Sequence, residues 1–200
     1  MSATKILPEG YTLKKEIDLQ KDLGLLVRLN IMAIILLPPV AYGLYWLTMV
    51  LRSKPATILQ VMTPRISPLV YILALALALI MTMILHELAH GLVFWAVTHQ
   101  VPKFGFRGAY AFAAAPNWFI SRLTYFFIGA APLVIISLIG IILIPVIPLQ
   151  LLSAWLFGLL TNTIGAVGDI YILFILLRQP ASTLIQDRGD AISFFTDTVR

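Results

Sequence analysis

Two histidines and a glutamate near the middle of the chain have the types and spacing of a metal site with an adjacent base. His86 and His90 are four residues apart, so on a helix both imidazoles project from one face, about one turn apart. Their neutral ring nitrogens can then bind a single Zn²⁺ ion. Glu87 follows the first histidine directly, a position from which a carboxylate can act as general base on a zinc-bound water. Bound zinc lowers the pKa of its water to about 7, so a nucleophile would be available at neutral pH.

A catalytic zinc ion also needs a third protein ligand and one open position. Within the apolar segments of the chain, Glu87 and Asp169 are the only acidic residues. His99 is the remaining histidine, but it lies nine residues beyond His90 and is rotated off the ligand face of the helix. We therefore predict that His86, His90 and Asp169 bind one Zn²⁺ per chain.

The residues before Asp169 form a narrow face of small and polar side chains. Gly158, Asn162, Gly165 and Asp169 are separated by steps of four, three and four residues. Small residues let helices approach closely in lipid, so this face should pack against the histidine face. Asn162 would then turn toward the site as an auxiliary catalytic residue that orients either a substrate backbone or a metal ligand.

These candidate residues lie in segments that are apolar enough for a lipid bilayer. The chain has 200 residues, of which 60% are hydrophobic and 12% charged, and its mean hydropathy is +0.95. Soluble domains are far less apolar. A helix of about 20 residues crosses a bilayer, and four apolar runs reach that length, at 31–51, 68–98, 118–147 and 151–177. Ionisable residues inside such runs are costly to bury and indicate a functional site.

The sequence thus predicts an all-α integral membrane protein in which four transmembrane helices form a bundle. The membrane domain would cover residues 31–177, with the zinc-site core at 68–177. A cytoplasmic segment, 1–30, would precede it and a cytoplasmic tail, 178–200, would follow. The stretch 101–115 alternates in part, which fits either a short β-hairpin between the second and third helices or an ordinary interfacial aromatic loop. A hairpin there could offer an edge strand to an extended substrate.

The distribution of basic residues predicts the orientation in the membrane. They lie before the first run, around the loop between the second and third runs or after the fourth, with three exceptions: Arg52, Lys54 and Arg65. Because Lys and Arg collect in cytoplasmic loops, we expect a multi-pass protein of the cell membrane with both termini in the cytoplasm. The bilayer is then an obligatory partner. The net charge is +5, but the sequence shows no cluster of basic residues that would form a basic surface. No nucleic-acid partner is therefore expected.

This orientation makes the second and fourth runs point the same way across the membrane. His90 and Asp169 then each lie eight residues before the inner end of their helix. At 1.5 Å per residue, both side chains are roughly 12 Å deep. The two predicted ligands can therefore meet.

The order of these motifs resembles the site-2 protease type of intramembrane zinc metalloprotease. In that type one span carries the HExxH motif, a second span follows, and a third span contributes an Asp ligand with an upstream Asn. His86-Glu87-Leu88-Ala89-His90, the 118–147 run, Asn162 and Asp169 match this order over roughly residues 68–177. The resemblance implies a zinc-dependent peptidase that acts on membrane proteins or peptides.

The chain resembles more closely a family of small membrane proteins described as zincin peptidases. Its Leu7-Pro8-Glu9-Gly10 sequence looks like the beginning of those proteins. It departs from the usual Asn-Pro-Asp-Gly pattern of site-2 proteases, because Asp169 stands between Gly168 and Ile170.

Three other interpretations remain open at the level of sequence. A membrane metal-ion transporter could use the same motif, although it would need further ligands along a path. A non-catalytic zinc-binding scaffold could keep the site without the reaction. Finally, the histidines and Asp169 could form a polar contact between two spans without any metal.

Overall fold

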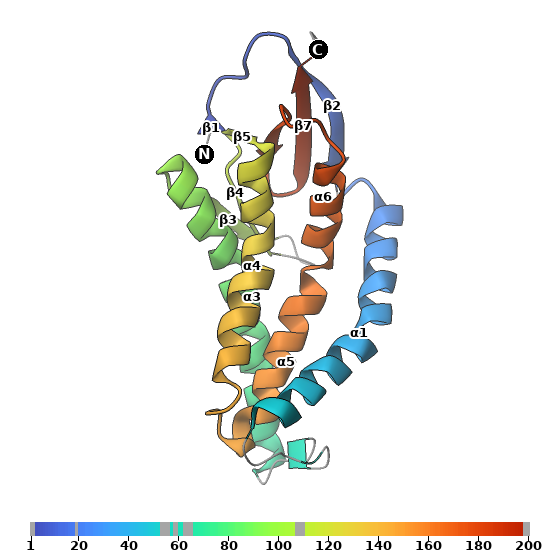
Figure 1. The fold of residues 1–200 in the computed structure, drawn as a ribbon, viewed down its shortest axis with the longest axis vertical. Helices are drawn as coiled ribbons and strands as arrows, with labels where there is room; N and C mark the ends of the chain where they lie inside the picture. The colour runs from blue at the N-terminus through green and yellow to red at the C-terminus, as the bar shows by residue number, and fades with distance from the viewer. Residues whose placement is uncertain are drawn as a thin grey trace. The chain divides into compact units, whose positions relative to one another are not determined.

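The computed structural model describes residues 3–18, 20–52, 57, 60–61, 66–106 and 111–197. Within these residues the chain is mainly helical, but it also forms two antiparallel sheets (Figure 1). The prediction of an all-α fold is therefore wrong. Most of the unexpected strands lie in the polar terminal segments, where no apolar run indicated an ordered element. Four of the basic residues used for orientation lie outside the described residues: Lys54, Arg65, Arg107 and Arg200.

In the part of the chain that the structure describes, four helical segments are long and apolar enough to cross a membrane, as expected of an integral membrane protein. They are α1 (Leu23–Leu51), α3 (Pro68–Thr98), α4 (Arg122–Leu143), and the consecutive pair α5 (Leu149–Gly165) and α6 (Val167–Leu177). The first helix begins earlier than the apolar run that predicted it. The third begins later than residue 118, because the residues just before it form a strand.

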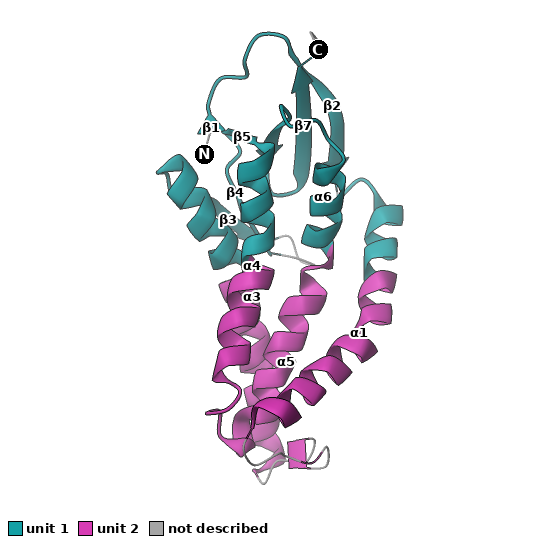
Figure 2. Ribbon diagram, in the orientation of Figure 1, with its two compact units in different colours: residues 1–30, 87–131, 168–200 teal, residues 31–86, 132–167 magenta. Residues whose placement is uncertain are grey.

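The chain divides into two compact units, which Figure 2 shows in different colours. Unit 1 consists of Met1–Asn30, Glu87–Ala131 and Gly168–Arg200. Unit 2 consists of Ile31–His86 and Pro132–Val167.

Unit 1 contains a five-stranded antiparallel sheet assembled from distant parts of the chain. Its order is β1 (Ala3–Thr4), β5 (Phe119–Ser121), β6 (Leu184–Asp187), β7 (Ala191–Asp197) and β2 (Tyr11–Asp18). Ile120 pairs with Ile185, and Ile185 pairs with Phe194. All three side chains are fully buried, so this row is the core of the sheet.

The strand pairing joins three distant segments of the chain. β1 and β2 precede α1, β5 lies between α3 and α4, and β6 and β7 follow α6. Because these strands are hydrogen-bonded to each other, the segment before α1, the α3–α4 connection and the segment after α6 meet in one sheet.

A second, two-stranded sheet lies in unit 1 where the sequence allowed a hairpin. β3 (Lys103–Phe106) pairs with β4 (Ala111–Ala114), while residues 107–110 between them lie outside the described part. The ring of Phe104 packs against Gly91 of α3, where an added Cβ would come within 2.5 Å of it. The two strands are thus held against the helix directly beside His90.

Unit 2 contains the close approach of α5 to α3 and α4. Thr82 Oγ1 donates a hydrogen bond of 3.4 Å to the Gly158 carbonyl, which brings the glycine of α5 against the histidine-bearing helix. Gly140 of α4 faces Leu159 so closely that an added Cβ would lie 2.2 Å from that side chain. Glycine permits both approaches because it has no side chain to separate the helices.

Candidate metal centre

The three predicted ligands lie together. One ring nitrogen each of His86 and His90 and one carboxylate oxygen of Asp169 all lie within 4.8 Å of one another. His90 Nε2 is 3.4 Å from Asp169 Oδ1, and His90 is almost entirely buried. Two imidazoles and one carboxylate are a common protein ligand set of catalytic zinc.

The fourth span is divided into two helices just before Asp169. α5 ends at Gly165, and Ala166 links it to α6 with φ −71° and ψ 2°. The sequence predicted a single span over residues 151–177. Asp169 consequently lies in the first turn of α6, where the helix dipole favours a negative side chain.

The first histidine is oriented by Asn162. The Nδ1 atom of His86 lies 3.0 Å from Asn162 Oδ1, and the Asn162 side chain is buried. The amide nitrogen of Asn162 donates to the Pro132 carbonyl at 3.4 Å. A carbonyl can only accept, so this contact turns Asn162 Oδ1 toward His86, whose Nδ1–H is then the donor. Of the two roles considered for Asn162, this geometry supports the one that orients a metal ligand.

The second histidine is oriented by a main-chain carbonyl of α4. His90 Nδ1 lies 2.8 Å from the Ile128 oxygen in a buried contact. Because that oxygen can only accept, the proton must be on Nδ1. Both rings therefore present Nε2 as the basic nitrogen, and a hydrogen bond from the opposite ring nitrogen is the usual support of a zinc-bound histidine. The residues present thus fit a zinc ion.

Comparison with protein families agrees with this donor set. A family described as "Putative zincin peptidase" matches residues 79–184. The chain belongs to this family. The match includes the HExxH residues and Asp169, and it confirms the resemblance to zincin peptidases found in the sequence. A search of curated proteins and a search of solved structures each found no match.

Glu87, the zincin motif's acidic residue, lies on α3 between the two histidines and is half-buried. Gly91 follows it by four residues, so both lie on the same face of the helix. Since Phe104 of β3 packs on Gly91, the two-stranded sheet lies about one helical turn from the candidate base.

His99, the histidine excluded by its spacing, lies outside the cluster. α3 ends at Thr98, and His99 is exposed with a positive φ of 53°. Its N–H still bonds the Trp95 carbonyl at 2.8 Å, which closes the last turn of the helix. In this zincin-family chain His99 therefore terminates a helix.

The sequence did not predict a buried hydrogen-bonded pair in unit 1, formed by Tyr125 and Asp187. The Tyr125 hydroxyl donates to Asp187 Oδ2 at 2.6 Å, and the Gly189 N–H donates to Oδ1 at 2.8 Å. Burial raises the pKa of the Asp187 carboxyl above its ordinary value, while the hydrogen bond from Tyr125 lowers it. The Tyr125 ring also meets that of Phe94, with 6.4 Å between centroids. This pair joins the end of β6 to α4, the helix whose carbonyl orients His90.

We predict that Tyr125→Phe destabilises the protein by about 1–3 kcal/mol, because a buried oxygen of Asp187 loses its donor. Tyr42→Phe is the matched control, since Tyr42 is 70% exposed on α1. Denaturant unfolding of the two purified variants in one detergent measures the difference. Equal stability of the two variants would show that the buried hydrogen bond contributes nothing.

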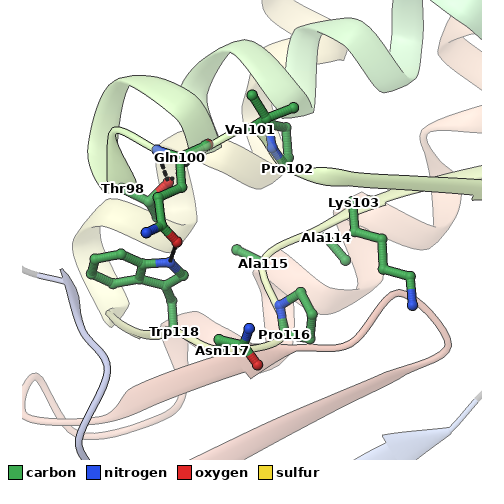
Figure 3. A pocket seen from close by; sticks show the side chains of 10 residues that line it. All are labelled: Thr98, Gln100, Val101, Pro102, Lys103, Ala114, Ala115, Pro116, Asn117 and Trp118. Carbon is green, nitrogen blue, oxygen red and sulfur yellow. Dashed lines mark hydrogen bonds between the residues drawn. The ribbon is translucent and has the colours of Figure 1, made fainter.

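Unit 1 also has a cavity of about 190 Å³ between the end of α3, the two-stranded sheet and the segment before β5 (Figure 3). Trp118 lies at its edge and donates to Gln100 Oε1 at 3.2 Å. Lys5 lies over the Trp118 ring, 5.2 Å from its centroid. The cavity is lined by none of the candidate zinc ligands, so it is separate from the metal centre.

Proposed function

We propose that this protein is a zinc-dependent peptidase that hydrolyses peptide bonds of membrane proteins or peptides, in or at the membrane. The observation that carries the proposal is the cluster of His86, His90 and Asp169 on membrane-spanning helices, with both imidazoles already oriented by Nδ1 hydrogen bonds. Membership of the zincin family supports the class of reaction. The relation to site-2 proteases is the narrower form of the same proposal.

His86, His90 and Asp169 would hold the zinc ion, which when bound would supply an activated water and polarise the scissile carbonyl. Glu87 accepts a proton from the water as the water oxygen attacks the carbonyl carbon. Glu87 then passes that proton to the leaving amide nitrogen as the C–N bond breaks. The hydrogen bonds to Asn162 and the Ile128 carbonyl keep the two imidazole rings in their orientation during these steps.

The substrate segment is proposed to bind in an extended form. A helical substrate hides its scissile amide in backbone hydrogen bonds, so it must unwind before it can react. Within the described residues β3 and β4 pair only with each other, and each presents an outer edge to which an extended segment could add. Their contact with Gly91 supports binding near Glu87.

We further propose that the five-stranded sheet and both termini lie in the cytoplasm. This is supported by the five-stranded sheet, whose strands come from the segment before α1, the α3–α4 connection and the segment after α6, because hydrogen-bonded strands of one such sheet lie on one side of a bilayer. These segments contain most of the basic residues of the chain, which favours the cytoplasmic face.

Cells that contain wild type, Glu87→Gln or His99→Ala protein test the function. New amino termini of membrane-protein fragments are compared among the three. We expect a set of fragments that is shared by wild type and His99→Ala and is missing with Glu87→Gln, because His99 is exposed and outside the cluster. Identical fragments in all three would reject peptidase activity at this site.

A further inference from the structure

Pro132 lies inside α4 and removes one hydrogen-bond donor from that helix. In an α-helix each N–H bonds the carbonyl four residues earlier. The residue four positions before Pro132 is Ile128. Because proline has no N–H, the Ile128 carbonyl has no helical donor at its usual place.

The Ile128 carbonyl is the group that binds His90. Its oxygen accepts the hydrogen bond from His90 Nδ1 at 2.8 Å, and the Ile128 side chain is 1% exposed. Water has little access to such a position. The proline therefore leaves a buried acceptor on α4 at the carbonyl that His90 contacts.

Pro132 has a second contact with the residues that support the ligands. Its own carbonyl accepts the hydrogen bond from Asn162 Nδ2, and Asn162 Oδ1 faces His86 Nδ1. One residue of α4 is thus connected to the orienting partners of both histidines.

We infer that Pro132 is a positioning residue: it keeps the Ile128 carbonyl available to His90 and so holds His90 in the tautomer that binds zinc through Nε2. This inference rests on the proposed zinc site. The simpler alternative is that Pro132 only shapes a membrane helix, as prolines often do. α1 provides the comparison, because Pro38 and Pro39 also lie inside a helix.

The experiment compares Pro132→Ala with Pro39→Ala in the purified full-length protein. Alanine restores an N–H at position 132, which then competes with His90 for the Ile128 oxygen. Pro39→Ala restores an N–H opposite Ile35, whose side chain is 66% exposed on α1. Zinc affinity is measured by competition with a chelator of known affinity, starting from zinc-free protein.

We expect Pro132→Ala to weaken zinc binding by about 10- to 100-fold, as loss of a supporting hydrogen bond usually does. Pro39→Ala should bind zinc like the wild type. The melting temperature of zinc-free Pro132→Ala should equal or exceed that of the wild type, since alanine is the better helix former. Nitrogen-15 NMR of histidine-labelled, zinc-free protein should show a changed His90 Nδ1 signal in this variant alone, because that N–H loses its acceptor.

Equal zinc affinity of Pro132→Ala and wild type would overturn the inference, because it would mean that the Ile128 oxygen accepts both donors without loss. So would an equal loss in Pro39→Ala, or a lower melting temperature of zinc-free Pro132→Ala, since both indicate a general structural role. If the wild type takes up no zinc, the proposed function fails. The His90 Nδ1 signal then still decides whether Pro132 positions the ring.

Discussion

Glu87→Gln is expected to keep zinc while losing peptide cleavage by about 10²- to 10⁴-fold, the usual contribution of a general base. Glutamine is nearly the same size as glutamate, but its amide cannot accept the proton of the attacking water. The metal should remain, because His86, His90 and Asp169 are unchanged and Glu87 is not among the clustered ligands. Zinc content and cleavage of a substrate identified from the fragment comparison are measured on the same preparation.

Two outcomes would contradict this role of Glu87. Cleavage at the wild-type rate would remove Glu87 from the mechanism. Zinc flux into proteoliposomes that persists with Glu87→Gln would instead favour a metal transporter. Glu9→Gln is the control for the change of charge, since Glu9 is exposed and far from the motif in sequence.

Asp169→Ala is expected to lose most of the bound zinc. Its zinc affinity should fall by more than the roughly 10- to 100-fold that follows loss of a residue that only supports a ligand. The substitution removes the only carboxylate of the cluster and leaves two neutral imidazoles on one helix. A catalytic zinc site has three protein ligands, so two cannot hold the ion comparably. Elemental analysis of purified protein gives the zinc-to-chain ratio, which should be near one in the wild type.

The matched control is Glu9→Ala, which also removes one carboxylate but lies in an exposed segment before β2. It should bind zinc like the wild type. Unchanged zinc content in Asp169→Ala would eliminate Asp169 as the third ligand. Together with Glu87→Gln, the pair of variants separates the residue that binds the metal from the residue that moves the proton.

The candidate ligands could be found from the sequence because they break the pattern around them. His86, His90 and Asp169 are polar residues inside long apolar helices, and such residues need a reason to be buried there. Helical spacing alone placed the two histidines on one face. Counting residues from the helix ends placed His90 and Asp169 at similar depth, and the structure brings them within 3.4 Å.

The five-stranded sheet could not be foreseen in the same way. β2 pairs with β7, and these strands lie at opposite ends of the chain. Each is short and has charged neighbours, so neither has the long apolar run that marks a span. Each strand is stabilised by contacts with its partner strand, and no local pattern identifies a partner so far away in sequence.

The support of His90 was missed for another reason. The partner of His90 is a main-chain carbonyl, which every residue possesses and no motif records. The one local signal was Pro132, four residues after Ile128, since a proline in a helix always leaves a carbonyl without its donor. Asp187 could not be recognised either, because it is one of three acids in a polar tail and is expected to be solvated until the fold buries it against Tyr125.

The central claim is that side chains of α3 and α6 together hold one divalent cation. X-ray absorption at the zinc edge of the purified wild-type protein tests it most directly. We expect stoichiometric zinc with nitrogen and oxygen neighbours at about 2.0–2.2 Å and the outer-shell scattering of two imidazoles, reduced to sub-stoichiometric metal in Asp169→Ala. Protein that takes up no zinc, or zinc without imidazole scattering, would contradict the account.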